Sequence, residues 1–169
     1  MWDAVCNRLG EVLGEKVKLN SIRSVSGGCI HQAKALETSS GTYFAKVNHL
    51  EALPMFEAEA TGLAAIAATK TARCPKVILI DQINGQAVLI LEYIPMTSAS
   101  RGSMTLLGKQ LAAMHKSTQE QFGWPEENHI GRTPQTNAPC EDWVEFYRTR
   151  RLEFQLKLCR DKGLRIVET

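Results

Sequence analysis

A lysine and a glutamate in two successive predicted elements are the strongest candidates for chemistry in this sequence. Lys46 lies in the apolar run Tyr43 to Val47, where burying an ammonium group without a partner would be costly. In the alanine-rich stretch that follows, Glu59 shares a helical face with Phe56, whereas Glu57 points about 100° away. Kinase-like folds use such a pair to hold a lysine against nucleotide phosphates. The residues alone leave two alternatives open, a lysine on a solvated strand face and a glutamate at the edge of an amphipathic helix.

A glycine-containing run precedes this lysine in the sequence. Its two adjacent glycines allow the backbone to approach a phosphate closely and to point N–H groups at it. We therefore predict nucleotide-binding roles for the residues of this run, namely Gly27, Gly28, Cys29 and Ile30. The run is not the G-x-G-x-x-G loop of protein kinases, and glycines between two strands can also serve turn geometry alone.

A later segment has the character of a kinase hinge. The apolar run Val88 to Ile94 ends at Pro95 and leads into a polar connector. In kinase-like folds the backbone at this place reads the edge of adenine, so backbone groups of Glu92 and Ile94 are predicted to meet the base. The alternative is a buried strand that simply leaves its sheet.

The elements that would position these residues are helices set apart from runs of strands. Hydrophobic periodicity predicts helices over 2–13 and 55–69, and strands over 22–26, 31–37, 42–48, 77–80 and 87–92. Neighbouring strands with separate helices indicate an α+β fold with a mainly antiparallel sheet. With the lysine and the glutamate, this pattern predicts a protein-kinase-like N-terminal lobe followed by the helical start of a C-terminal lobe.

The sequence changes character after the predicted sheet. We predict a nucleotide-binding lobe over 1–94, a hinge or linker over 95–102 and a partial helical lobe over 103–169. Within the last region we predict a helix around 107–114, an irregular stretch over 117–139 and a final helix from 143 to about 163. The large aromatic residues of that final helix, Trp143, Tyr147 and Phe154, are expected to belong to a core.

Composition excludes several other classes of protein. The 169 residues are 44% hydrophobic and carry a net charge of +2, which provides no broad field for nucleic acid or an anionic membrane. No apolar run approaches the roughly 20 residues that span a bilayer. The five cysteines are scattered and form no C-x-x-C pair, so neither a disulfide framework nor a zinc site is expected. A reducing cytoplasm is the expected location.

Short motifs along the whole chain are similar to those of one kinase family. They include Ser26–Ile30, Tyr43–Asn48, Met55–Ala60, Leu91–Tyr93, Met114–His115, Phe122–Gly123, Asn128–Asn137, Asp142–Trp143 and Arg150–Leu152. On these motifs the sequence resembles the fructosamine kinases, also called ketosamine 3-kinases, which are relatives of the aminoglycoside and choline kinases. The stretch around Thr133–Gln135 is specific to this family, which makes another small-alcohol kinase a weaker alternative.

The resemblance implies an activity, a nucleotide and a metal ion. Members of this family use ATP and Mg²⁺ to phosphorylate the sugar 3-hydroxyl of fructosamines and other ketosamines, which frees the amine. They also carry a His-Gly-Asp catalytic loop and a later Asp-Pro motif for magnesium, and neither motif occurs up to Thr169. We therefore expect no catalytic residue and no metal ligand among these residues, and no turnover by them alone. The rival from a different class is a non-catalytic nucleotide-binding or interaction module.

Cys29 differs from the other four cysteines because it falls within the predicted phosphate-binding run. Glycine neighbours are expected to leave its thiol accessible, and backbone N–H groups together with Lys46 would favour the thiolate. In families that resemble this one, a cysteine of this kind is linked to redox control through pairing of two chains. This implies a possible homodimer through Cys29, against the alternative of a small residue that merely fits.

Overall fold

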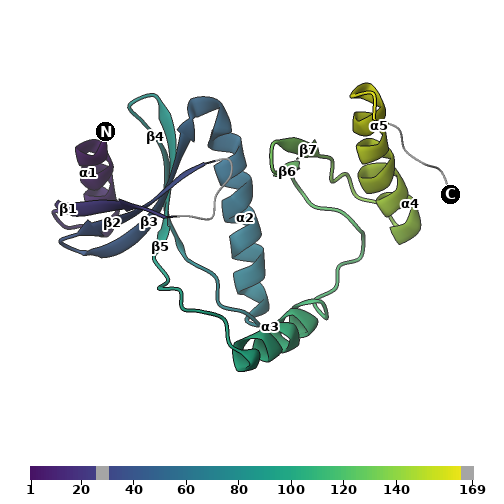
Figure 1. Ribbon diagram of the computed structural model, residues 1–169, viewed down its shortest axis with the longest axis horizontal. Helices are drawn as coiled ribbons and strands as arrows, with labels where there is room; N and C mark the ends of the chain where they lie inside the picture. The colour runs from purple at the N-terminus through teal and green to yellow at the C-terminus, as the bar shows by residue number, and fades with distance from the viewer. Residues whose placement is uncertain (26–30, 165–169) are drawn as a thin grey trace. The chain divides into compact units, whose positions relative to one another are not determined.

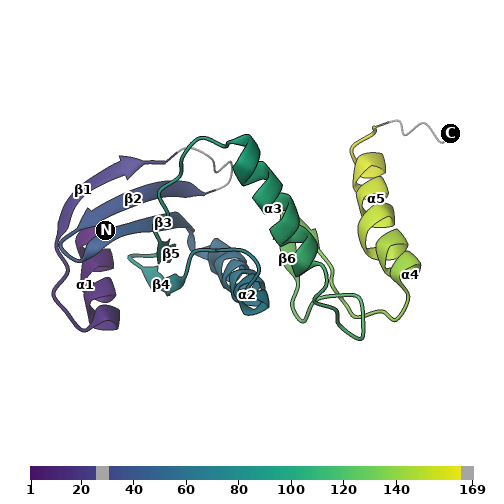
Figure 2. The ribbon, with the colours of Figure 1, turned by 90° about the horizontal axis from the view of Figure 1, so that it is seen from below.

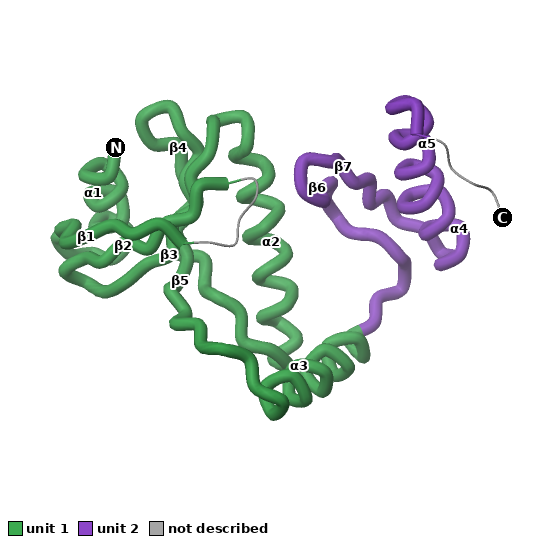
Figure 3. The backbone as a smooth tube through the Cα atoms, viewed as in Figure 1, with its two compact units in different colours: residues 1–117 green, residues 118–169 purple. Residues whose placement is uncertain are grey.

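The computed structural model describes residues 1–25 and 31–164. The chain forms two compact units, Met1–Ser117 and Thr118–Thr169 (Figure 3). The linker predicted at 95–102 stays a prediction. Within the described ranges, no helix combines the length and the apolar character needed to cross a bilayer.

The first unit contains a five-stranded antiparallel sheet with the strand order β1-β2-β3-β5-β4 (Figure 1). Its strands are β1 (Leu19–Ser24), β2 (Gln32–Thr38), β3 (Gly41–His49), β4 (Val77–Ile83) and β5 (Gln86–Glu92). The β4–β5 hairpin turns at Asn84 and Gly85, which both have positive φ, as a tight turn between twisted strands requires. The predicted α+β fold with an antiparallel sheet is confirmed.

Two helices cover opposite faces of this sheet. Helix α1 (Trp2–Leu13) packs in one hydrophobic core with strand side chains from one face of the sheet. Helix α2 (Leu53–Thr69) packs in a second core with strand side chains from the other face. A short 3₁₀ turn (Leu50–Ala52) precedes α2. On β5, Val88 and Ile90 lie in the first core, whereas Leu89 and Leu91 lie in the second. Because successive strand residues point to opposite faces, the sheet has a helix on each side (Figure 1).

Helix α3 (Arg101–Met114) completes the first unit. A capping box begins the helix, with the Ser103 N–H donating to Ser100 Oγ at 3.1 Å and the Ser100 N–H donating to Ser103 Oγ at 2.8 Å. The helix starts earlier than predicted because this reciprocal cap, rather than the apolar periodicity that begins at Leu107, determines its first turn.

The second unit contains a small hairpin and a C-terminal helical segment. Strands β6 (Asn128–Ile130) and β7 (Thr133–Gln135) pair within the stretch predicted to be irregular, so that prediction is wrong for these residues. The chain reverses there at Gly131, which has a φ of 64°, a value that glycine adopts at little cost.

The final helix is not uniform. It consists of α4 (Trp143–Tyr147), a wider π-helical turn (Arg148–Glu153) and α5 (Phe154–Asp161), which run on from one another (Figure 2). Phe146 is buried, but Trp143 and Tyr147 are 51% and 43% exposed. The expectation that these two are core residues is therefore wrong within this unit, which is too small to bury every large side chain.

Candidate functional site

The Lys46 and Glu59 side chains meet between β3 and α2. Lys46 Nζ donates to both carboxylate oxygens of Glu59, at 2.6 Å to Oε1 and 2.8 Å to Oε2. The side chains are 24% and 28% exposed, so the pair is partly shielded from solvent. The predicted ion pair is confirmed, and its role in binding nucleotide remains a prediction.

Strand and helix periodicity place these two residues opposite each other. Ala45 and Val47 are buried in the core shared with α1, so Lys46 between them points to the face that α2 covers. On α2, the buried Phe56 is one helical turn before Glu59. Glu57 is exposed, as its helical direction predicts.

A histidine that the sequence analysis did not select lies beside this pair. His31 Nδ1 is 2.8 Å from Asn48 Nδ2, and its ring centroid is 4.8 Å from that of Phe56. Burial lowers the pKa of His31 below its ordinary value, and Lys46 lowers it further, while Glu59 opposes the shift. His31 is the first residue of the strand predicted over 31–37, and periodicity within that strand carried no signal for this role, because its contacts come from β3 and α2.

The predicted hinge has part of its backbone already engaged. The Glu92 N–H donates to the Lys76 carbonyl at 2.8 Å, so this N–H is occupied within the fold. The Glu92 carboxylate accepts from Arg73 Nη2 at 2.7 Å and from the Lys76 N–H at 3.3 Å. The Arg73 guanidinium is the main cause of a lowered Glu92 pKa. Ile94, the other residue whose backbone is predicted to meet adenine, lies two residues after the last residue of β5.

A family model described as fructosamine kinase matches residues 1–169. This chain belongs to the fructosamine kinase family.

Relatives of this fructosamine kinase family member bear kinase names. "Probable ketoamine kinase slr1563" of Synechocystis is 38% identical over 163 residues, covering 96% of this chain and 55% of the relative. The chloroplastic "Protein-ribulosamine 3-kinase" of Arabidopsis thaliana is 41% identical over 152 residues, covering 88% of this chain and 46% of the relative. The chain thus spans about half the length of these relatives.

A solved structure supports the kinase-like fold of this family member. The "Putative fructosamine-3-kinase" of Haemophilus somnus superposes with a TM-score of 0.87 at 26% identity, over 96% of this chain and 56% of that protein. The fold predicted from the sequence is therefore confirmed by a structure from the same family.

The predicted phosphate-binding run cannot be placed in this geometry. Gly27, Gly28, Cys29 and Ile30 lie outside the described residues. Within residues 1–25 and 31–164, no cluster of three or more His, Cys, Asp and Glu side chains could hold a metal ion. Of the side chains predicted to bind nucleotide, Lys46 and Glu59 lie among the described residues.

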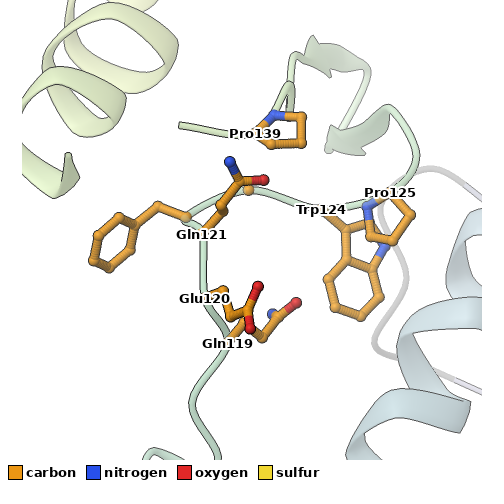
Figure 4. A pocket seen from close by; sticks show the side chains of 8 residues that line it. Gln119, Glu120, Gln121, Trp124, Pro125 and Pro139 are labelled. Atoms are coloured by element: carbon orange, nitrogen blue, oxygen red, sulfur yellow. The ribbon is translucent and has the colours of Figure 1, made fainter. Parts of the chain in front are cut away.

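The second unit has a hollow of its own, of about 430 Å³. It is formed by the segment Gln119–Pro125 together with Pro139, and Figure 4 shows Trp124 and Pro125 on one side of it. Its lining contains one ionisable side chain, Glu120. The residues that line this hollow therefore include no cationic side chain that could pair with a phosphate.

Proposed function

We propose that this chain forms the nucleotide-binding part of an ATP-dependent kinase that phosphorylates ketosamines, such as fructosamines, at the sugar 3-hydroxyl. The observation that carries the proposal is the Lys46–Glu59 ion pair in a chain of this family. The names of the relatives, ketoamine kinase and ribulosamine 3-kinase, support the substrate class.

In this proposal Lys46 is the group that contacts the nucleotide phosphates. Its ammonium group stabilises their negative charge, and the Glu59 carboxylate holds it in one position through two hydrogen bonds. Such a cradle acts by positioning and electrostatic stabilisation rather than by covalent chemistry. The backbone of Gly27, Gly28, Cys29 and Ile30 would add N–H donors, and the Glu92 carbonyl and the Ile94 N–H would meet adenine.

The transfer step needs groups besides this cradle. Mg²⁺ would neutralise charge between the phosphates, and a carboxylate would orient the attacking sugar hydroxyl. We propose that neither group is supplied by these 169 residues, so that they bind ATP without turning it over. The ketosamine is then the small-molecule partner of the complete site, in keeping with an expected cytoplasmic location.

Nucleotide affinity measured on Lys46→Ala tests the proposal. We expect the variant to bind a non-hydrolysable ATP analogue roughly 10- to 100-fold more weakly, since charge-assisted hydrogen bonds to phosphate are lost. Lys18→Ala, which removes an exposed lysine of the same unit, is the matched control and should bind like the parent chain. Equal binding by all three proteins would reject the site.

A second measurement separates the kinase from a non-catalytic module. Phosphate transfer to fructosyl-lysine should be detected in a longer chain that spans the full length of the relatives, and should be abolished by Lys46→Ala. Lys46-dependent nucleotide binding without any transfer by the longer chain would favour the non-catalytic alternative. Transfer to an aminoglycoside or to choline in place of the ketosamine would favour the other kinases.

A further inference from the structure

His31 touches both elements that carry the ion pair. Its ring nitrogen contacts Asn48 on β3, and its ring packs against Phe56 on α2. Lys46 belongs to the same strand and Glu59 to the same helix. We call this arrangement, in which His31 contacts Asn48 and Phe56, the His31 bridge.

Register explains why the bridge lies beside the ion pair. Gln32 of β2 pairs with Val47 of β3, so the next residue outward, His31, lies opposite Asn48. Lys46 and Asn48 are two residues apart on β3 and so project from one face. Phe56 and Glu59 are one turn apart on α2 and share a helical face. The bridge and the ion pair are therefore two adjacent connections between the same strand and the same helix.

The hydrogen bonds of Asn48 determine which form of His31 fits. Asn48 Oδ1 accepts from the His49 N–H at 2.8 Å, which requires the amide oxygen on that side. The amide nitrogen therefore faces His31, and because it can only donate, His31 Nδ1 must accept. An imidazole accepts at Nδ1 only when that nitrogen carries no proton, so the neutral ring is the form that the bridge requires.

Protonation would oppose the bridge in two ways. A proton on Nδ1 would place two donors face to face, and rotating the Asn48 amide would give up its bond from the His49 N–H. The imidazolium would also lie near the ammonium group of Lys46. The charged groups that act on His31 are Lys46 from β3 and Glu59 from α2.

We propose that neutral His31 is a positioning residue, which holds α2 against β3 through Phe56 and Asn48 and thereby fixes the Lys46–Glu59 pair for nucleotide binding. The predicted effect on nucleotide binding rests on the proposed function. Beyond that function, the proposal assigns a role to His31, which acts through the Lys46–Glu59 pair, and it predicts that nucleotide affinity falls when the His31 ring is protonated.

The sign of the pH effect follows from the same contacts. Burial and Lys46 lower the pKa of His31 in the folded chain, whereas in the unfolded chain it returns to about 6.5. The unfolded state therefore takes up the proton first. The stability that the bridge contributes is complete above about pH 6.5 and decreases as the pH falls toward the lower folded-state pKa.

Two substitutions separate the ring contact from the hydrogen bond. His31→Asn keeps a short side chain with an acceptor for Asn48 but does not titrate. His31→Phe keeps a ring against Phe56 but has no acceptor. His49→Gln, which replaces an exposed histidine next to Asn48 and keeps the backbone N–H, is the matched control.

The test measures binding of an ATP analogue from pH 5.5 to 8.0 for the 169-residue chain and these variants. The nucleotide phosphates titrate in the same way with every protein. The ratio of the dissociation constants of parent and variant therefore isolates the contribution of His31 to the pH dependence. At pH 8.0 we expect His31→Phe to bind roughly threefold to thirtyfold more weakly than the parent, and His31→Asn to recover most of that loss. Between pH 8.0 and 5.5 the parent should lose affinity relative to His31→Asn, while His49→Gln follows the parent.

Urea unfolding of the same proteins without nucleotide provides an independent measurement. The unfolding midpoint of the parent should fall relative to that of His31→Asn as the pH drops below about 6.5. Equal pH dependence of parent and His31→Asn in both measurements would overturn the inference, whatever Lys46→Ala shows. If the unfolding shift appears but Lys46→Ala binds nucleotide like the parent, the proposed function fails and the positioning role fails with it.

Discussion

Both oxygens of the Glu59 carboxylate accept hydrogen bonds from one group, the Lys46 ammonium, at 2.6 and 2.8 Å. Neither side chain is more than about a quarter exposed, so neither charge would be fully solvated if its partner were removed. The pair thus connects a strand to a helix and at the same time keeps a cation in a fixed position. These two effects can be measured separately.

Glu59→Ala is expected to destabilise the first unit by about 1–3 kcal/mol. This range lies between that of exposed ion pairs and that of buried ones, because the Lys46 ammonium would remain partly shielded without its carboxylate. The free energy of unfolding in urea measures the cost. Glu57→Ala, on the exposed side of the same helix, should change it by less than about 0.5 kcal/mol. Equal effects of the two substitutions would contradict the structural role of the pair.

The 169-residue chain alone is expected not to phosphorylate a ketosamine. The His-Gly-Asp and Asp-Pro motifs do not occur up to Thr169, and we predict that nucleotide positioning alone leaves the transfer step unassisted. The measurement is transfer of labelled phosphate from ATP to fructosyl-lysine against a no-protein control. Turnover above that control, abolished by Lys46→Ala, would show that this expectation is wrong.

Asn137→Ala is expected to destabilise the second unit. Asn137 is 1% exposed, its Nδ2 donates to the Glu126 carbonyl at 2.9 Å, and its Oδ1 accepts from Arg151 Nη2 at 2.7 Å. The substitution removes both bonds from a buried position, at a cost of about 1–3 kcal/mol. Faster amide hydrogen exchange over residues 118–164 would report this loss. The control is Asn20→Ala at an exposed site in β1, which should leave that exchange unchanged.

Gly123→Ala is expected to destabilise the same unit for a steric reason. Gly123 has a φ of 145°, and a Cβ there would lie 2.7 Å from the Asn137 carbonyl oxygen and 3.0 Å from Pro139 Cα. Because the contacts are with backbone, the strain should cost about 1–3 kcal/mol. Gly62→Ala makes the same substitution in open space within α2, and it should have the opposite effect, stabilising the first unit by up to about 1 kcal/mol. Thermal unfolding that moves in the same direction for both would contradict this interpretation.

Oxidation is expected to join two chains through Cys29. This hypothesis comes from the sequence alone, because Cys29 lies outside the described residues. A thiolate favoured by glycine-loop N–H groups would react with mild peroxide, and the resulting disulfide should weaken nucleotide binding. A non-reducing gel measures the dimer. A parent chain that stays monomeric, or a Cys29→Ala variant that dimerises equally, would contradict dimerisation through Cys29.

Local periodicity was sufficient to predict the ion pair. Alternation along a strand determines that Lys46 points away from the side of Ala45 and Val47, and a helical repeat of 3.6 residues places Glu59 on the face of Phe56. Both rules act within a few residues, so the sequence alone determined the face that each charged group occupies on its own element, and the pairing was predicted from the use of such a pair in kinase-like folds. The hairpins of the antiparallel sheet followed in the same way from the strand patterns and the turns between them, whereas the pairing of β3 with β5 joins strands far apart in the sequence.

The tertiary structure decided the features that depend on residues far apart in sequence. His31 acquires its role because β3 supplies Asn48 and α2 supplies Phe56, and no local pattern around His31 encodes either neighbour. The Glu92 N–H is occupied because β5 lies next to the start of β4, where the Lys76 carbonyl accepts it. Free energy from such contacts is gained only when separate elements pack together, so their positions follow from the fold rather than from the local sequence.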